Sequence, residues 1–117
     1  MAVDKSLASG STMMLLLRLL EEKDMYGYEM IEELRRKSEN VFELKAGTLY
    51  PLLHGMEEKG YVDSYEQESL GKMRKYYALT KEGKRQLGAK REEWNEYTKA
   101  VANVLGAFSG NGGVCFE

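Results

Sequence analysis

The sequence predicts an α+β fold that is mostly helical. Three observations predict it: three segments with apolar residues at helical spacing before residue 60, two alternating segments between residues 61 and 79, and a seven-residue apolar repeat after residue 80. A chain of 117 residues, 43% of them apolar, suffices for one compact domain with an appended element. We expect a domain over residues 1–79, a long helix over 80–109 and a flexible tail over 110–117.

Two helices are expected before residue 38. In the first, from about Asp4 to Glu22, leucine and methionine recur on two faces, which favours burial on more than one side and hints at a partner subunit. After a break at residues 23–25, the second helix is expected from about Tyr26 to Lys37. Its inward stripe is predicted to contain Tyr28, Ile31 and either Leu34 or Arg35.

A third helix has the clearest pattern, with an inward face formed by Leu49, Leu52, Leu53 and Met56. Pro51 is tolerated in the first turn of a helix, where no amide donor is needed, so the helix is expected to begin between Ala46 and Thr48. Gly60 is expected to end it in the left-handed conformation.

Two strands should follow, over residues 61–67 and 72–79, with a turn at 68–71. Thr80 is expected to cap the last helix. Three cations gather at the tip of the strand pair: Lys72, Arg74 and Lys75. A helix followed by a ribbon with a basic tip is the arrangement of a winged helix-turn-helix, which places the helix in a groove of double-stranded DNA and the ribbon beside it.

The distribution of charge supports this interpretation. The net charge is only −2, yet residues 72–91 hold eight basic residues and one acidic residue. A basic stripe on an acidic body suits phosphate binding in one orientation. The alternative is a solvated, lysine-rich helix face.

The outward face of the third helix supplies candidate contacts to DNA: Lys45, Thr48, Tyr50 and His54. His54 is equally well explained as a plain surface residue, and Tyr50 as a packing tyrosine whose hydroxyl reaches the surface. The tyrosines of the strands more often cover a core than stack on bases, so single-strand binding is the weaker alternative.

The seven-residue repeat in the last helix has Leu87, Trp94, Val101 and Phe108 at one position and Lys90, Tyr97 and Val104 at the other. A second copy of the chain is the simplest cover for this stripe, so we expect a homodimer. The alternative is that the stripe packs only on the first helix of its own chain.

Four segments together resemble the PadR family of bacterial transcriptional regulators: residues 20–34, Gly47–His54, Glu57–Gly60 and Arg74–Thr80. The resemblance covers residues 13–83 and is closest to the compact branch of that family. It implies a homodimeric winged helix that represses nearby genes and is released by a small molecule or a stress signal. It places near DNA the residues Tyr26, Lys45, Thr48, Tyr50, His54, Lys72, Arg74 and Lys75.

The resemblance also implies an effector site. Some drug-binding relatives place a tryptophan in the last helix and hold flat aromatic compounds between two such side chains. The corresponding residues here are Met13, Met14, Trp94, Tyr97 and Thr98. Thr98 replaces an acidic residue of those relatives, which favours a neutral ligand. Packing of Trp94 in the dimer interface explains the residue equally well.

Other function classes fit poorly. No catalytic triad, phosphate loop or pair of histidine ligands is present, so we expect no enzyme, cofactor or metal site. The apolar run at residues 13–20 is too short to span a membrane, and the single Cys115 is typical of a reducing compartment, which together suggest the cytoplasm. A winged helix that docks proteins without touching DNA remains the alternative, although it has no need of a basic tip.

Overall fold

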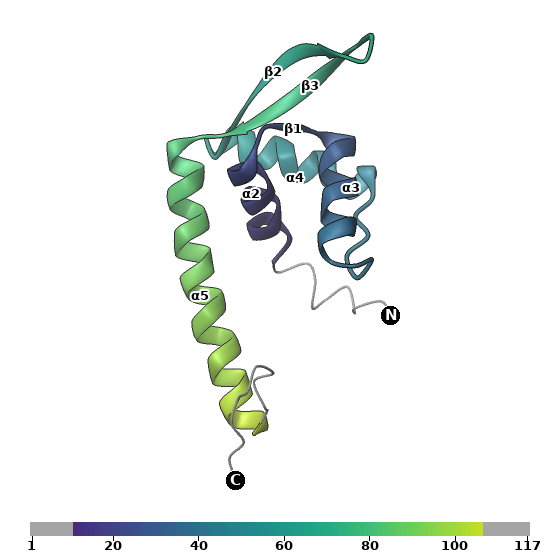
Figure 1. The fold of residues 1–117 in the computed structure, drawn as a ribbon. Helices are drawn as coiled ribbons and strands as arrows, with labels where there is room; N and C mark the ends of the chain where they lie inside the picture. Colours follow the sequence, from purple (N-terminus) through teal and green to yellow (C-terminus); the bar gives the residue numbers. More distant parts are fainter. Residues whose placement is uncertain (1–10, 107–117) are drawn as a thin grey trace. The chain divides into compact units, whose positions relative to one another are not determined.

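The computed structural model describes residues 11–106, which divide between Leu87 and Gly88 into two compact units. The elements follow in the order shown in Figure 1. They are α2 (Thr12–Glu22), β1 (Met25–Tyr26), α3 (Gly27–Lys37), α4 (Ala46–Glu58), β2 (Val62–Ser69), β3 (Lys72–Leu79) and α5 (Lys81–Leu105). The mostly helical α+β fold with a long C-terminal helix is confirmed.

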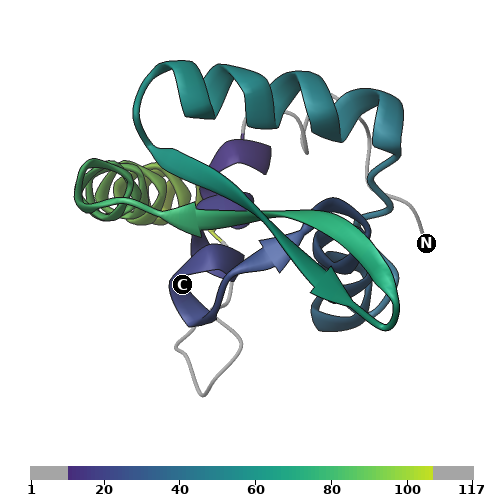
Figure 2. The ribbon, with the colours of Figure 1, turned by 90° about the horizontal axis from the view of Figure 1, so that it is seen from above.

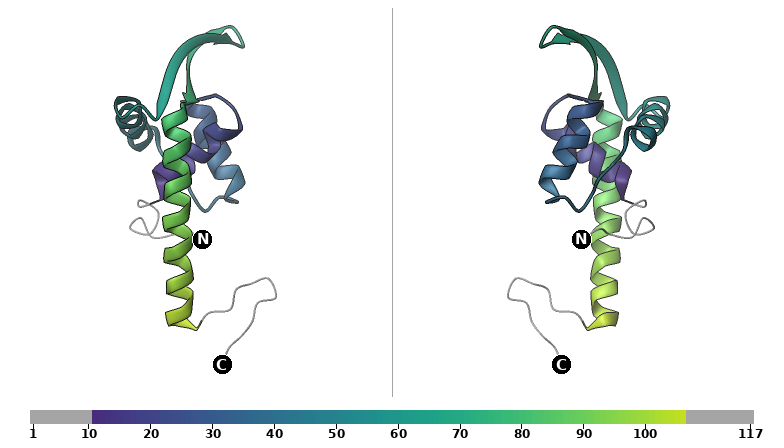
Figure 3. Two further views of the ribbon diagram at one scale, coloured as in Figure 1. Left: turned by 90° about the vertical axis from the view of Figure 1, so that its left-hand side faces the viewer. Right: turned by 90° about the vertical axis from the view of Figure 1, so that its right-hand side faces the viewer.

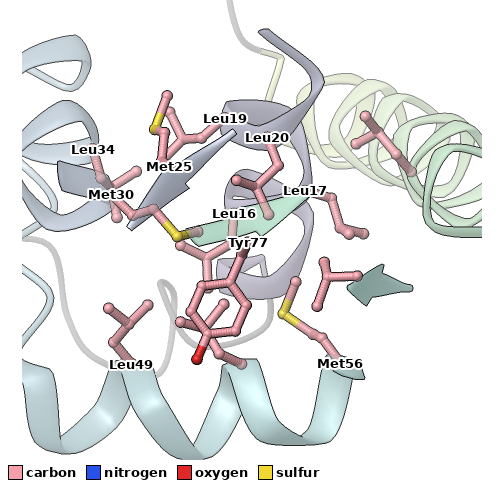
Figure 4. Close-up of a cluster of buried hydrophobic side chains, with 13 residues drawn as sticks. Leu16, Leu17, Leu19, Leu20, Met25, Met30, Leu34, Leu49, Met56 and Tyr77 are labelled. Atoms are coloured by element: carbon pink, nitrogen blue, oxygen red, sulfur yellow. The ribbon is translucent and has the colours of Figure 1, made fainter. Parts of the chain in front are cut away.

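The core of the first unit lies where its helices meet the strands (Figure 4). Helix α2 contributes four buried leucines at 16, 17, 19 and 20, so both of its apolar faces are covered within the chain. They give no indication of a partner. The expected start of this helix, before residue 11, lies outside the described residues. The other core residues are Met25, Met30, Leu34, Leu49, Leu53, Met56, Val62, Tyr77 and Leu87.

Helix α3 buries the expected stripe only in part. Gly27, Met30 and Leu34 face the core, whereas Tyr28 is 60% exposed. Leu34 is buried and Ile31 packs partly buried against the core, so the prediction was wrong only at Tyr28, which is apolar enough to be counted as inward. The correction places the Tyr28 side chain on the surface.

Helix α4 begins at Ala46, within the expected range, but Pro51 is its sixth residue and lies in the second turn rather than the first. Pro51 therefore cannot donate the hydrogen bond that the Gly47 carbonyl would accept in a regular helix. The end of the helix is as predicted. Gly60 has φ +80°, its N–H donates to the Glu57 carbonyl at 3.0 Å, and the Tyr61 N–H donates to the Met56 carbonyl at 2.9 Å. This is a Schellman ending.

The three strands form an antiparallel sheet in the order β1-β3-β2, with β3 in the middle (Figure 2). Tyr76 on β3 lies between Tyr26 on β1 and Tyr65 on β2. The two-residue strand β1 was missed in the sequence, where residues 23–25 were assigned to a break. Two residues are too few to show an alternating pattern.

Strands β2 and β3 form the wing, which projects beyond the helices of the first unit (Figure 3). Strand β2 runs to Ser69, two residues further than expected, and pairs there with Lys72. The turn therefore consists of Leu70 and Gly71, both at positive φ, 53° and 81°. Positive φ at both central residues is the geometry of a type I′ hairpin turn.

Thr80 caps α5 as predicted. The Gly83 N–H donates to the Thr80 hydroxyl oxygen at 2.9 Å, and that hydroxyl donates to the Gly60 carbonyl at 2.6 Å. The same threonine thus satisfies an orphan amide of α5 and a carbonyl that follows α4.

In the second unit, residues 88–105 continue α5. Its exposed apolar side chains recur at helical spacing: Trp94, Tyr97, Val101, Val104 and Leu105. No helix among the described residues is long and apolar enough to cross a membrane.

Candidate nucleic-acid interface

A hollow of about 340 Å³ lies in the first unit between the start of α3, the middle of α4 and strand β3. Five residues expected at DNA line it, although they come from three distant segments of the sequence. They are Tyr26, Tyr50, His54, Arg74 and Lys75. The hollow is also lined by Gly27, Tyr28, Met73 and Tyr77.

Helix α4 supplies Tyr50 and His54, which are one helical turn apart and therefore share a face. Tyr50 is 39% exposed and packs its ring directly on Gly27. A Cβ atom at Gly27 would lie 2.2 Å from the Tyr50 hydroxyl oxygen. The hydroxyl end of Tyr50 therefore packs against the start of α3, as expected of a packing tyrosine, and its contact with DNA stays a prediction.

Arg74 lies over the ring of Tyr26, with its guanidinium carbon 4.4 Å from the ring centroid. This is a cation–π arrangement, which confines the direction of a long side chain. The Tyr26 ring meets that of Tyr76 edge-on at 5.5 Å between centroids. The structure therefore places Tyr26 underneath Arg74 at the edge of the hollow.

Lys75 lies on the other face of β3, where its ammonium nitrogen is 5.6 Å from the centroid of the Tyr77 ring. Tyr77 is almost fully buried, and this burial raises the pKa of its hydroxyl above the ordinary value, while the neighbouring Lys75 opposes the shift. Glu66 is directly across from Lys75 on β2, but the two form no ion pair.

The remaining predicted contacts lie outside the lining of the hollow. Lys45 is the exposed N-cap residue of α4, and Thr48 is exposed in the first turn of that helix. Lys72 is exposed beside the wing turn. Lys45 and Thr48 occupy the helix end whose dipole and free N–H groups favour an anion.

The described cations of the first unit divide into those that pair with a carboxylate and those that do not, and the second group also includes Lys59, Lys81 and Lys84. Arg18, Lys23, Arg35, Arg36, Lys37 and Arg85 each pair with a carboxylate. No carboxylate of residues 11–106 pairs with the four cations expected at DNA, which are Lys45, Lys72, Arg74 and Lys75. Their charge is thus uncompensated in the free protein.

Comparisons with known proteins agree with this geometry. The profile of the "Transcriptional regulator PadR-like family" matches residues 16–89. A transcriptional regulator of Clostridium thermocellum is 37% identical and superposes with a TM-score of 0.78 over 86% of this chain and 95% of its own. A PadR family transcription regulator of Clostridium difficile is 41% identical, with a TM-score of 0.74 over 83% of this chain and 100% of its own.

The chain belongs to the PadR-like family of transcriptional regulators. A protein of Lysinibacillus sphaericus, described only as "Uncharacterized protein X", is 38% identical over 74% of this chain and 81% of its own length. The family match covers the winged helix and the residues that line the hollow. The resemblance inferred from the four sequence segments is confirmed, as is the winged-helix fold that it implied.

Four residues of the hollow in this PadR-like chain were not expected from the sequence: Gly27, Tyr28, Met73 and Tyr77. Gly27 stands between two tyrosines, which is a signal for close packing that was available in the sequence. Tyr28 was assigned to the core, and Met73 was passed over because it interrupts the basic residues of the wing.

The residues expected in the dimer interface do not all lie in the same unit. Leu87 is 1% exposed and packs in the core of the winged helix, so it must be removed from the expected seam. Trp94, Val101 and Val104 are exposed on α5. Phe108 lies outside the described residues, as do Cys115 and the tail.

The residues expected at an effector also divide. Met13 and Met14 are partly buried on α2 and pack against the core of the first unit. In the second unit, the rings of Trp94 and Tyr97 lie 6.2 Å apart between centroids. The Thr98 hydroxyl donates to the Trp94 carbonyl at 2.9 Å, so it serves the helix backbone.

Proposed function

We propose that this PadR-like regulator binds a pseudo-palindromic operator in double-stranded DNA as a homodimer. Helix α4 enters the major groove, and the wing contacts the neighbouring backbone and minor groove. The hollow then receives the sugar-phosphate strand between these two contacts. The alternative is docking of a protein partner, which does not require two unpaired cations, Arg74 and Lys75, in one hollow.

The hollow is the observation that carries this proposal. It brings together a helix face, the start of another helix and a strand, with Arg74 and Lys75 supplying positive charge and Tyr50 a hydroxyl. A phosphate strand is recognised by such groups, since most protein–DNA hydrogen bonds go to phosphate and sugar oxygens. Lys45 and Thr48, at the N-terminal end of α4, would then be the first residues of the helix to enter the major groove.

The exposed apolar side chains of α5 support the homodimer. Trp94, Tyr97, Val101 and Val104 recur at the a and d positions of a heptad, and Val104 is 86% exposed in the free chain. We propose that residues 88–105 contain the dimer contact. Paired recognition helices would then meet successive major grooves roughly 34 Å apart.

We further propose that the regulator acts in the cytoplasm as a repressor and that a small planar aromatic compound releases it. The exposed pair of Trp94 and Tyr97 offers an aromatic surface to such a ligand. A ligand releases a repressor only if it binds more tightly to the state that cannot bind the operator. Because the chain has one tryptophan, ligand binding is measurable as a change in its fluorescence.

Selection of bound duplexes from a random pool tests the DNA-binding proposal. We expect wild-type protein to enrich one pseudo-palindromic motif, and Arg74→Ala/Lys75→Ala to lose it. Lys59→Ala provides the control, since it removes an exposed cation at the opposite end of α4. A folded dimer that enriches no motif would contradict the proposal and favour protein docking.

A further inference from the structure

A row of aromatic side chains lies on the face of the sheet opposite the core. Residues that are directly paired across strands share a face, as do alternate residues along one strand. Tyr77 on β3 pairs with Met25 on β1, and both are buried, which defines the core face. Tyr76 pairs with Tyr26 and Tyr65 on the other face, which Arg74 shares.

These side chains contact one another in sequence. The rings of Tyr65 and Tyr76 are stacked, with centroids 5.6 Å apart and planes inclined by 11°. Tyr76 then meets Tyr26 edge-on, and Tyr26 lies under the guanidinium of Arg74. The contacts thus run from β2 through β3 to β1 and return to Arg74, two residues from Tyr76 on β3.

The far end of this row is fixed by a hydrogen bond. The Tyr65 hydroxyl donates to a carboxylate oxygen of Asp24 at 2.7 Å, across 41 positions of sequence. Asp24 immediately precedes β1, so the bond joins the wing to the segment that leads into α3. The same bond raises the pKa of the Tyr65 hydroxyl, which therefore remains a donor at neutral pH.

Arg74 is held at a cost. Its Nε atom is buried and has no hydrogen-bond partner among the described residues. An unsatisfied buried donor is unfavourable, although the electron-rich ring of Tyr26 offsets part of that cost. Its charge is not engaged by any described carboxylate, which leaves it available to DNA.

We propose that Asp24, Tyr65 and Tyr76 are positioning residues that fix the direction of Arg74 and so set the sequence specificity of the regulator. This inference rests on the DNA binding proposed above. A contact from an arginine guanidinium to a base edge in the minor groove requires a defined direction, whereas the attraction of a cation such as Lys75 to phosphate does not. Loosening the row therefore weakens operator binding more than binding to unrelated duplexes.

A double-mutant cycle tests the proposal. Tyr65→Phe keeps the stacked ring and removes the hydrogen bond to Asp24. We expect it to weaken operator binding about threefold to tenfold, on the order of one hydrogen bond, and to change nonspecific binding less than about twofold. In an Arg74→Ala background the same change should have no further effect, because its target is gone. Tyr61→Phe, a hydroxyl deletion outside the row, should leave both affinities unchanged.

Two further measurements separate positioning from general damage to the wing. Asp24→Asn retains an oxygen acceptor and should preserve most of the specificity that Asp24→Ala loses. In the free protein, the Arg74 Nε–H should exchange slowly with solvent in NMR spectra and faster in Tyr65→Phe. This second readout needs no DNA.

The inference is overturned if Tyr65→Phe weakens binding equally with and without Arg74, since that marks a merely structural role. It is also overturned if Tyr65→Phe changes neither specificity nor the exchange of the Arg74 Nε–H. If the wild-type protein binds all duplexes equally and its Arg74 Nε–H is still protected from exchange, the proposed operator binding is contradicted, but the positioning of Arg74 is not.

Discussion

At the scale of single residues, Gly27 and Tyr50 show how the hollow is built. The ring of Tyr50 occupies the space that a side chain at Gly27 would need, so the position of one α4 residue depends on the absence of a Cβ atom in α3. The candidate contact His54 is one turn further along the same face. A larger residue at Gly27 should therefore lower the stability of the fold and weaken DNA binding.

We expect Gly27→Ala to destabilise the fold by about 1–3 kcal/mol, the usual range for overpacking, and to weaken DNA binding by displacing Tyr50. Gly55→Ala provides a matched control, because a Cβ at this α4 position meets nothing within 4 Å. It should stabilise the helix by about 0.5–1 kcal/mol. Thermal unfolding of both variants checks this, and a Gly27→Ala protein as stable as Gly55→Ala contradicts it.

Tyr77 predicts a dependence of stability on alkaline pH. Because burial raises its folded-state pKa above the unfolded value of about 10, its contribution is complete below that pH and is lost as pH rises through the folded-state pKa. Tyr77→Phe lacks the ionising hydroxyl and should lose less stability over this range. Denaturant unfolding of wild type and Tyr77→Phe from about pH 8 to about pH 11, a range that brackets the unfolded pKa, measures how much stability each protein loses. Parallel loss in both proteins counts against it.

At the scale of elements, the wing turn combines a favourable and an unfavourable residue. Gly71 suits its positive φ, but Leu70 adopts φ 53° and is 91% exposed, so it gains little from packing. A non-glycine residue in this conformation is strained, and asparagine tolerates it better than leucine. The turn is therefore less stable than its geometry allows.

Leu70→Asn should raise the stability of the protein by about 0.5–1 kcal/mol through relief of this strain. Ser69→Asn, one position earlier and at an ordinary φ, should have little effect. Unfolding in urea measures both changes. A Leu70→Asn protein that is no more stable than wild type would show that the leucine side chain is engaged after all.

Elements with local signals were predictable from the sequence. Thr80 and Gly60 were placed correctly because capping depends on side-chain chemistry and on left-handed backbone within a few residues. Strand β1 was not predictable, since its two residues are held only by pairing with Tyr76 and Tyr77. The inward stripe of α3 was wrong at Tyr28, because tertiary packing turns Gly27 and Met30 to the core instead.

The residues of the candidate site were predictable from the sequence, but the contacts that bring them together were not. The wing cations and the outward face of α4 follow from hydropathy and charge. The contact between Arg74 and Tyr26 depends on β1, which no sequence pattern indicated. Similarly, the predicted heptad repeat included Leu87, although that side chain is buried in the core of the winged helix.

At the scale of the whole molecule, the proposed function requires two copies of the chain. Val101 lies in the middle of the exposed apolar positions of α5. Val101→Glu should place an unpaired charge in the proposed interface and so dissociate the dimer, because burying such a charge is unfavourable. Operator binding should weaken at least about tenfold, which corresponds to about 1.4 kcal/mol. Sedimentation velocity measures the oligomeric state.

Asn103→Glu is the control for this prediction. It introduces the same side chain two residues away, on an exposed position outside the a and d positions. It should leave the dimer intact. A Val101→Glu protein that sediments as wild type would remove residues 88–105 from the proposed dimer contact.

Binding of Lys75 on the wing to a DNA phosphate is the basis of the proposed function, and it is measurable in the salt dependence of operator binding. A protein that neutralises phosphates shows a linear fall of log affinity with log salt concentration, with a slope of about −0.9 for each phosphate. We expect Lys75→Ala to weaken binding to all duplexes and to reduce the magnitude of that slope by about 1, whereas Lys59→Ala should leave it unchanged. Equal slopes for wild type, Lys75→Ala and Lys59→Ala would contradict it.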